Sequence, residues 1–392
     1  MVVTIVVLLI LAGISLNLVL GQNGIISRAQ DARNQTAEGQ VNTEKAVNAL
    51  TDEMEDLISE NENSGNGGNS GGGSSSGSDY EPASDGVTIP EGYYYVGGTK
   101  AKGIVISDNV ADKELDKGKE NVRRDLSGNQ WVWVPVETPS SLYTTVDAGQ
   151  ALAGSTGVKT TKYTNPEIIS GKTRVKPGDT SNCREPDILT HSTNGDNDDR
   201  AKTAGFSSLA NMAETMKSDY EEMIASLEKY KGFYIGRYEL TANGEKTGAT
   251  QTGVNWYTLY KNCTTLAKGT KVKTRMIWGL QWDATCNWLD NSGFSITDSS
   301  TWGNYSNNDA TGHGSKQNTG FSENWKANNI YDFAGNCFEF TQEANSTFRR
   351  ANSGGSYIYS GSYAPASSRN GGYPAGSGSS GFASRPTLYL IP

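Results

Sequence analysis

Apolar residues fill the first part of this chain without interruption by charge. Positions 2–20 are almost wholly apolar, and residues 1–27 carry no charged side chain. A helix of about 20 residues spans a bilayer at about 1.5 Å per residue, so this run predicts a transmembrane helix. The run lacks the basic segment and the small-residue cleavage site that mark a cleaved signal peptide.

Behind this run the pattern changes to a single apolar stripe. The positions of this stripe recur mostly every three or four residues as far as Leu57, with charged residues between them, which is the period of an amphipathic helix. We expect one continuous helix over residues 1–60 that first spans the membrane and then forms a stem. The stripe consists of Ile25, Ala29, Ala32, Thr36, Val41, Val47, Leu50, Met54 and Leu57.

The next segment has the composition of a flexible tether. Residues 61–79 consist mainly of Gly, Ser and Asn, which bury little apolar surface. A flexible chain of this length has an end-to-end distance of roughly 25 Å. The expected domains are therefore a transmembrane and stem helix at 1–60, a linker at 61–86 and a head at 87–392.

The head alternates short structured segments with long polar loops. Residues 131–136 (WVWVPV) alternate as a strand, and residues 232–241 (GFYIGRYELT) have strand composition. Residues 207–230 place apolar side chains on one face of a helix, and residues 255–266 predict a second, short helix. These elements predict an α+β, irregular and loop-rich head.

Charge and composition narrow the function. A formal net charge of −9 disfavours nucleic acid as a partner, because phosphate binding needs a basic face. The chain has two histidines and shows no paired carboxylates, nucleophile–base spacing or phosphate loop, so no familiar enzyme class is indicated. Two disulfides or free buried thiols both remain open for the cysteines, which form no Cys-x-x-Cys pair. They are Cys183, Cys263, Cys286 and Cys337.

Several motifs of the head occur in a family order. Residues 331–341 read YDFAGNCFEFT, residues 354–357 read GGSY, and residues 381–386 read GFASRP. Together with GFYIGRYELT they resemble the formylglycine-generating-enzyme-like (sulfatase-modifying factor) domain, which implies a C-type-lectin-type fold for residues 87–392. The apolar helix that precedes this head resembles a type IV pilin stem.

The resemblance implies no oxidase chemistry in this chain. In the oxidase branch of the family, a pair of cysteines after the GGSY motif holds copper. Here Tyr359 and Ala364 stand at those positions, and no cysteine lies beyond Cys337. A phenol and a methyl group neither bind Cu(I) nor form a mixed disulfide, so we expect a non-catalytic head without copper.

The resemblance also implies a calcium site in the GNCFE segment. In the family a calcium ion takes side-chain oxygens at the positions of Asp332 and Glu339, and backbone carbonyl oxygens between them, here from Gly335 and Cys337. Carboxylate and carbonyl oxygens are the ligands that Ca²⁺ prefers. The alternative is that Asn336 and Glu339 hydrogen-bond the loop backbone instead.

Two neighbouring features are expected to be structural. Phe338 and Phe340 are predicted to lie in the core. The acidic stretch 194–199 lacks the ligand spacing of an EF-hand and predicts a solvated loop.

The segment 353–383 has the composition of a binding surface. It is rich in Ser, Gly and Tyr, in which Tyr supplies rigid contact area while Ser and Gly let the backbone conform. The alternative is ordinary loop composition. Arg369 and Arg385 are expected either to contact an acidic ligand or to form internal salt bridges. The candidate ligand-binding residues are Tyr357, Tyr359, Ser360, Ser362, Tyr363, Arg369, Asn370 and Tyr373.

These inferences predict a single-pass membrane protein that displays its head outside the cell and binds an extracellular protein or glycan. Lectin-type heads of this kind are also targets of diversity-generating retroelements, which implies a C-terminal face of variable sequence. The alternative is a structural or tip subunit of a type IV pilus-like filament, with other pilin subunits as partners.

Deleting residues 1–27 should convert a detergent-requiring protein into one that is soluble without detergent, because the tether separates the apolar helix from the head. Size-exclusion chromatography and near-UV circular dichroism of both forms measure this, and the near-UV spectrum should be unchanged. Aggregation with loss of the near-UV signal would instead show that the apolar run belongs to the core of the head.

Overall fold

The computed structural model describes most of the head. The predicted membrane helix and stem, most of the linker and Cys183 lie outside the described residues. Of the helices that are described, none combines the length and the apolar character needed to cross a bilayer. The described residues are 81–82, 86–137, 143–145, 161–163, 168–169, 172–173, 185, 188–370 and 373–392.

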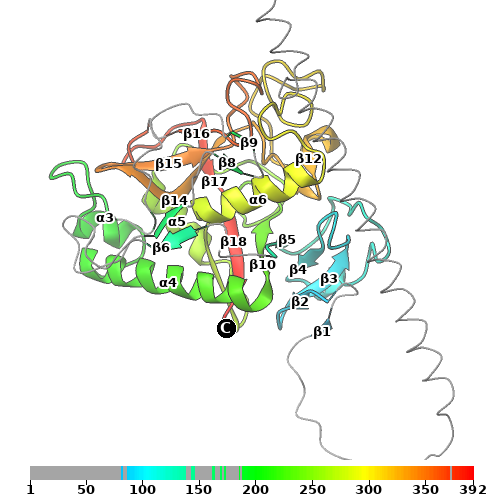
Figure 1. The fold of residues 1–392 in the computed structure, drawn as a ribbon, viewed down its shortest axis with the longest axis horizontal. Coiled ribbons are helices and arrows are strands. Elements are labelled where there is room, and N and C mark those ends of the chain that lie inside the picture. Colours follow the sequence, from blue (N-terminus) through cyan, green and yellow to red (C-terminus); the bar gives the residue numbers. More distant parts are fainter. Residues whose placement is uncertain are drawn as a thin grey trace, which may run out of the picture. The chain divides into compact units, whose positions relative to one another are not determined.

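A six-stranded antiparallel sheet runs through the head (Figure 1). The C-terminal strand pairs with a neighbour on each side, so the end of the chain is an internal part of this sheet. In order across the sheet, the strands are β11 (Val272–Met276), β18 (Pro386–Leu390), β10 (Gly232–Gly236), β5 (Gln130–Pro135), β4 (Val105–Ser107) and β3 (Tyr94–Gly97).

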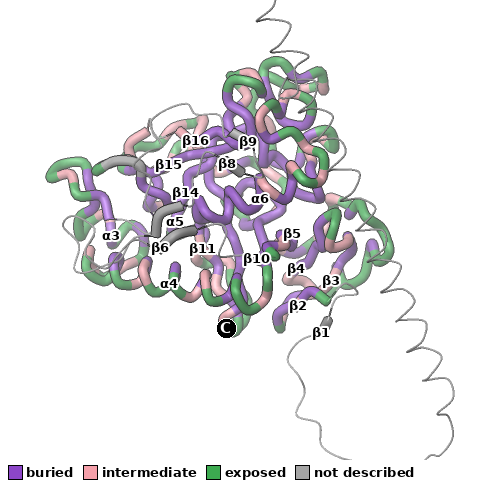
Figure 2. The backbone as a smooth tube through the Cα atoms, viewed as in Figure 1, coloured by how far each residue is buried: buried purple, intermediate pink, exposed green. Residues whose placement is uncertain are grey.

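Both faces of this sheet are buried. On β5, Val132 and Val134 belong to one apolar cluster, while Trp131 and Trp133 belong to another on the opposite face. Successive side chains of a strand point to opposite faces, so the alternation predicted from WVWVPV is confirmed. In Figure 2, the central strands consist mainly of buried residues, and the exposed residues lie mainly in the peripheral loops.

Three of the four described α-helices begin at a residue whose side chain caps the helix: Asn197, Ser208 and Asn255. The Ser208 hydroxyl accepts a hydrogen bond from the Asn211 amide at 3.2 Å, and Asn255 Oδ1 accepts one from the Thr258 amide at 3.0 Å. The helices predicted at 207–230 and 255–266 are thereby confirmed as α4 and α5. The α-helices of the described residues are α3 (Asp198–Thr203), α4 (Leu209–Tyr230), α5 (Trp256–Thr264) and α6 (Gly279–Asn291).

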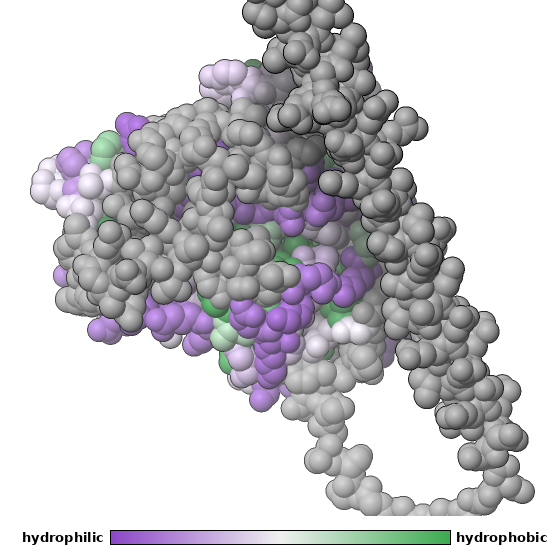
Figure 3. Space-filling view, in the orientation of Figure 1, coloured by the Kyte–Doolittle hydropathy of each residue, from purple (hydrophilic) through white to green (hydrophobic). Residues whose placement is uncertain are grey.

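In helix α4, the buried side chains are the ones that recur every three or four positions in the sequence. Met212, Met216 and Met223 are buried, whereas Glu214 and Glu221 face solvent. The helix contacts β10 and β18 with its apolar side. Figure 3 shows mainly hydrophilic atoms along this helix on the face that it draws.

A smaller four-stranded sheet carries the GNCFEF segment. In order it contains β16 (Arg369–Asn370), β15 (Arg349–Ser353), β14 (Phe338–Ser346) and β17 (Phe382–Ser384), with β14 and β17 parallel. Phe338 lies opposite Phe382, so the two rings share one face of this sheet, while Glu339 points to the other. The remaining elements are β1 (Glu81–Pro82), β2 (Thr88–Ile89), β6 (Tyr143–Thr145), β7 (Thr161–Tyr163), β8 (Ile168–Ile169), β9 (Lys172–Thr173), β12 (Lys326–Ala327), β13 (Ile330–Tyr331), η1 (Val110–Asp112) and η3 (Glu323–Trp325).

The strand predicted at 232–241 is shorter in the structure. It ends at Gly236; the Arg237 amide still donates to the Gln130 carbonyl of β5 at 3.0 Å, and the next two amides donate to side chains. The Tyr238 amide donates to Glu245 Oε1 at 2.5 Å, and the Glu239 amide donates to Thr319 Oγ1 at 3.1 Å. At Tyr238 and Glu239, side-chain acceptors thus replace the pairing with a neighbouring strand.

The acidic stretch 194–199 is exposed at Asn194, Asn197, Asp198 and Asp199, as its composition predicts, but Asp196 is buried. The Asp196 carboxylate is buried, where it pairs with Arg350 at 3.1 Å and accepts a hydrogen bond from the Tyr257 hydroxyl at 2.5 Å. Asn197 caps the N-terminus of α3. A cation and a phenol from distant segments thus bury a carboxylate that looks exposed in the sequence.

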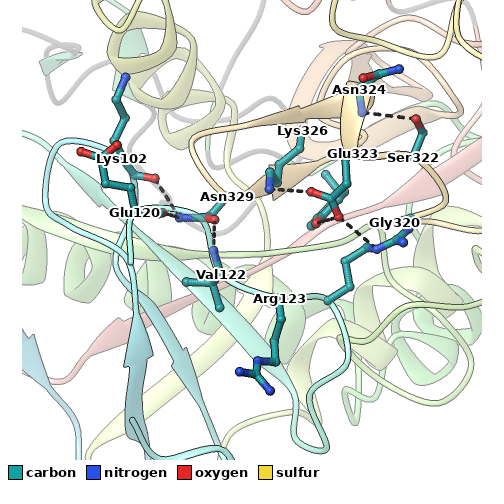
Figure 4. Close-up of polar contacts among 12 residues, drawn as sticks. Lys102, Glu120, Val122, Arg123, Gly320, Ser322, Glu323, Asn324, Lys326 and Asn329 are labelled. Atoms are coloured by element: carbon teal, nitrogen blue, oxygen red, sulfur yellow. Dashed lines mark hydrogen bonds and ion pairs between the residues drawn. The ribbon is translucent and has the colours of Figure 1, made fainter. Parts of the chain in front are cut away.

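Asn329 ties the N-terminal part of the head to the β12–β13 hairpin. Its Oδ1 accepts from the Val122 amide at 3.0 Å, and its Nδ2 donates to the carbonyl oxygens of Lys102, Gly103 and Glu120 at 2.8–3.0 Å. Figure 4 shows this amide between the two segments. Asn329 is buried and has a φ of 66°, a left-handed conformation that Asn tolerates better than most residues.

Replacing Asn329 with Gly keeps the left-handed backbone accessible but removes these hydrogen bonds. We expect the free energy of unfolding to fall by about 2–4 kcal/mol, since a buried amide hydrogen loses its acceptor. Asn328→Gly is the matched control, because Asn328 is also left-handed but bonds through its side chain to Ser292 Oγ. Urea unfolding of both variants measures the difference, and equal losses would contradict this role for Asn329.

Candidate ligand-binding face

Five aromatic rings form a continuous row across the smaller sheet and the loops beside it. Tyr363 contacts Tyr359 with ring centroids 5.5 Å apart, and Tyr359 contacts Phe338 at 5.8 Å. Phe338 then stacks on Phe382 at 5.5 Å, and Phe382 stacks on Tyr373 at 4.4 Å. We call this row the aromatic strip. It brings together three tyrosines that the sequence predicts as ligand contacts.

The strip is buried at its middle and exposed at one end. Phe338 is 6 % exposed, whereas Tyr359 and Tyr363 are 36 % and 62 % exposed. Ile358, beside them in the same turn, is 57 % exposed. The inner rings therefore anchor the strip, and the outer side chains offer apolar area to a partner.

Two loops position the exposed end. We call residues 295–321 the first loop and residues 354–368 the second loop, and the two lie side by side near the top of Figure 1. The Ser306 amide donates to the Tyr359 carbonyl at 2.9 Å, and the Ser299 amide donates to the Gly361 carbonyl at 3.0 Å. The Gly361 amide in turn donates to Asn307 Oδ1 at 3.0 Å. The second loop is thus held mainly through its main chain.

Glycine is required at two points of the second loop. Gly355 has a φ of 74°, and a Cβ there would overlap the Ala364 carbonyl oxygen. A Cβ on Gly361 would overlap the main-chain nitrogen of Ser300 in the first loop. Gly355 of the GGSY motif therefore lets the two ends of the second loop pack closely together. Gly361 lets the second loop pack closely against the first loop.

The other predicted contact residues divide between surface and interior. Arg369 is buried, with Nε 2.9 Å from Glu343 and Nη2 3.0 Å from Asp283, so contact with an outside ligand does not fit its position. Arg385 is likewise buried and paired with Glu339, so the internal alternative holds for both arginines. Ser362 is exposed, and the half-buried residues are Tyr357, Ser360 and Asn370.

Four buried carboxyl groups lie beneath this region: Glu239, Glu245, Asp332 and Glu339. Burial raises the pKa of Asp332 to about 6 and that of Glu339 to about 7. Burial, reinforced by the charges of Asp332 and Glu339, raises the pKa of Glu239 well above its usual range. Arg385 is the cation that faces all four groups and opposes these shifts.

The predicted calcium ligands are only partly arranged for an ion. Asp332 Oδ2 accepts from Thr319 Oγ1 and the Gly320 amide, while its buried Oδ1 has no partner among the described residues. Both Glu339 oxygens accept from Arg385. Within the described part of the chain, no group of three or more His, Cys, Asp or Glu side chains is placed to share a metal ion. Together with backbone carbonyls of Gly335 and Cys337, this ligand set stays a prediction.

Three of the four cysteines are described, and all three are buried thiols outside disulfides. They are Cys263, Cys286 and Cys337, so the thiol alternative holds for these positions. Burial raises the pKa of the Cys337 thiol well above its usual range, which keeps it protonated near neutral pH. Cys183 lies outside the described residues.

Sequence reasoning does not assign Ile358, Phe338 or Phe382 to the candidate face. Phe340 is fully buried, as predicted, but the equally predicted core residue Phe338 also touches Tyr359. The alternation of Phe338 and Phe340 in one strand is a signal for a shared face. That Phe382 lies on the same face depends on the parallel pairing of β14 with β17, which joins distant segments.

Comparisons with known proteins give slight likenesses. No family model matches the sequence, and no curated protein matches it. Treponema denticola variable protein 1 matches with a TM-score of 0.30 and 17 % identity over 41 % of this chain and 85 % of its own. The Major Tropism Determinant U1 Variant matches with a TM-score of 0.31 and 11 % identity over 41 % of this chain and 51 % of its own. These TM-scores are too low to assign the fold, so the C-type-lectin-type, formylglycine-generating-enzyme-like and pilin-like assignments stay predictions.

The buried carboxyls predict an unusual dependence of stability on pH. The pKa values of Asp332, Glu239 and Glu245 are higher in the fold than the value of about 4 in the unfolded chain, so the folded state holds more protons between about pH 4 and 7. The free energy of unfolding of metal-stripped protein should therefore fall as pH rises through this range, by on the order of 2 kcal/mol. Urea unfolding at intervals from pH 4.5 to 8 measures it.

A Glu245→Gln variant should flatten this profile, because it removes one buried carboxyl whose pKa is raised. Stability that rises with pH would show that the carboxylates are ionised in the fold.

Calcium and chelator added at pH 7.5 test the predicted metal site in the same series. An ion held by Asp332 would raise the melting temperature by mass action, whereas purely hydrogen-bonded carboxyls leave it unchanged.

Proposed function

We propose that the head binds an external ligand through the exposed end of the aromatic strip, without a covalent step. The observation that carries this proposal is the exposure of Ile358, Tyr359 and Tyr363 together on one rigidly held turn. Clustered exposed apolar side chains are typical of interaction sites, and tyrosines are frequent energetic anchors of interfaces.

The way in which the second loop is held supports variation of its surface. Hydrogen bonds reach the main chain at Tyr357, Tyr359 and Gly361, while the Tyr359 and Tyr363 rings project from that backbone. Exchange of the projecting side chains therefore leaves the supporting bonds in place. This separation is what a face of variable sequence, of the kind that diversity-generating retroelements target, requires.

The chemistry of the face favours a neutral contact. The five rings of the strip are uncharged, and residues 354–368 contain no charged side chain. A strongly charged ligand group would lose hydration here without gaining a countercharge. Affinity should therefore depend little on ionic strength, because little of it comes from charge pairs.

Display at the cell surface is part of the same proposal. The apolar helix would anchor the chain, and the stem and tether would hold the head away from the membrane, so that an extracellular protein or glycan can reach the strip. In a filament subunit the same head would decorate a fibre, and changes to the strip would leave assembly intact.

Changing Tyr359 and Tyr363 together to Ser should weaken binding at least about tenfold, since each ring can contribute about 1–3 kcal/mol at an interface. Tyr373 is kept, because it stacks on Phe382 and its loss would disturb the strip itself. The measurement is binding of the full chain in detergent to glycan and protein arrays, followed by titration of each hit.

The matched control is Val110→Ser with Leu115→Ser, which removes similarly exposed apolar side chains outside the strip. It should bind like the parent protein, and both variants should keep the parent melting temperature, as exposed substitutions usually do. Parent-like binding by the folded tyrosine variant would refute the proposed face and favour the filament alternative.

A further inference from the structure

Asn336 occupies an unusual position beneath the two loops. It is fully buried and has a φ of 52°, a left-handed conformation that non-glycine residues seldom adopt. It follows Gly335, whose Cβ, if present, would overlap the Asn304 carbonyl oxygen of the first loop. The chain is thus pressed against the first loop at this point.

The side-chain amide of Asn336 is fully used. Nδ2 donates to Glu239 Oε2 at 2.6 Å and to the Gln317 carbonyl at 3.2 Å. Oδ1 accepts from Asn304 Nδ2 and from the Gln317 amide, both at 3.0 Å. Two donor hydrogens and two acceptor lone pairs are all that an asparagine amide offers.

The main chain of Asn336 reaches both loops as well. Its N–H donates to the Asn304 carbonyl of the first loop at 2.9 Å, and its carbonyl accepts from the Tyr357 amide of the second loop at 3.1 Å. Tyr357 precedes the turn that carries Ile358 and Tyr359. One buried residue therefore contacts both loops that shape the exposed end of the strip.

Glu239 holds the other side of this amide. Its Oε2 also accepts from Thr250 Oγ1 at 2.6 Å, and its Oε1 accepts from the Cys337 amide at 3.0 Å. Through Glu239, Asn336 is bonded to the segment that follows β10 of the main sheet. Hydrogen bonds through Asn336 and Glu239 therefore connect the two loops to the main sheet.

We propose that Asn336, oriented by Glu239, is the positioning residue of the aromatic strip, and that it sets the two loops in the geometry that binds. The inference rests on the proposed function of the strip. It adds a residue that touches no ligand yet determines whether the exposed tyrosines stand where a ligand meets them. Glycine at this position would keep the backbone but lose the four side-chain bonds, and aspartate would lose the NH₂ group that donates to Glu239 and to the Gln317 carbonyl.

The donor–acceptor pairing between these two side chains can be broken and restored. Asn336→Asp places oxygen against oxygen. Glu239→Gln places an NH₂ group against either the Asn336 NH₂ group or the Cys337 N–H, because both Glu239 oxygens accept hydrogen bonds. In the double variant the glutamine amide can donate to the new aspartate, and the pair regains its bond with the parent's total charge. The double variant is therefore a rescue, as in a double-mutant cycle.

Hydrogen–deuterium exchange of the full chain in detergent, read by mass spectrometry, is the test. In each single variant, peptides from 300–317 and 355–364 should exchange about tenfold faster or more, because buried bonds to these loops are lost. Peptides from β5 and β10 should keep their parent rates. The double variant should return the loop peptides most of the way to the parent rate.

Asn329→Asp is the matched control, since Asn329 is also buried and left-handed but bonds to the segment 102–122. It should speed exchange there and leave the two loops unchanged. The proposal is overturned if Asn336→Asp leaves the loops at the parent rate, if all peptides accelerate together, or if the double variant gives no rescue.

This readout needs no ligand, so it separates the inference from the function on which it rests. Suppose that the loop peptides exchange faster in the single variants and recover in the double variant, while the Tyr359 and Tyr363 changes leave array binding unaltered. Asn336 would then remain the positioning residue of the loops, and the binding face would be refuted. The reverse combination, in which the tyrosine changes abolish binding but the loops of Asn336→Asp stay tight, would refute the inference and leave the face standing.

Discussion

The buried ion pair between Arg385 and Glu339 is the contact on which the rest of the head depends. The guanidinium donates to both Glu339 oxygens, to the Gly236 carbonyl at the end of β10 and to the Tyr331 carbonyl of β13. One side chain thus joins the main sheet, the β12–β13 hairpin and the smaller sheet. Removing one partner of such a pair leaves an uncompensated buried charge, at a cost of on the order of 3–5 kcal/mol. The arrangement of the two sheets is therefore tied to this contact.

The excess of carboxyl groups around Arg385 has a consequence for the face above it. Glu239 shares the cation with other buried acids and turns its remaining acceptor capacity toward Asn336 and the Cys337 amide. Asn336 is in turn hydrogen-bonded to the first and second loops. Support and display are consequently separate in this head. Buried polar groups and glycines hold the main chain of the loops, and the Tyr359 and Tyr363 rings project from that main chain.

Individual residues show which features could be predicted from sequence. The apolar side chains of α4 recur every three or four positions, and the Trp–Val alternation of β5 has a period of two, so both elements were readable. The exposed tyrosines were also readable, because Tyr among Ser and Gly is a binding composition. Asp196 was not, since its burial depends on Arg350, which lies 154 residues away. The predicted calcium ligand Glu339 met Arg385 instead, a partner 46 residues away.

The sequence by itself determined the local elements of the head, the glycines that its tight loop requires and the tyrosines of its C-terminal segment. It also determined the absence of a cysteine pair after the GGSY motif. These are properties of short segments, in which periodicity and residue type act over a few positions. Only the tertiary structure decided which charges are buried, that Phe338 and Phe382 continue the row begun by the tyrosines, and that Asn336 holds both loops. The physical reason is that burial and hydrogen-bond pairing depend on partners brought together by the fold, and no local pattern specifies a partner.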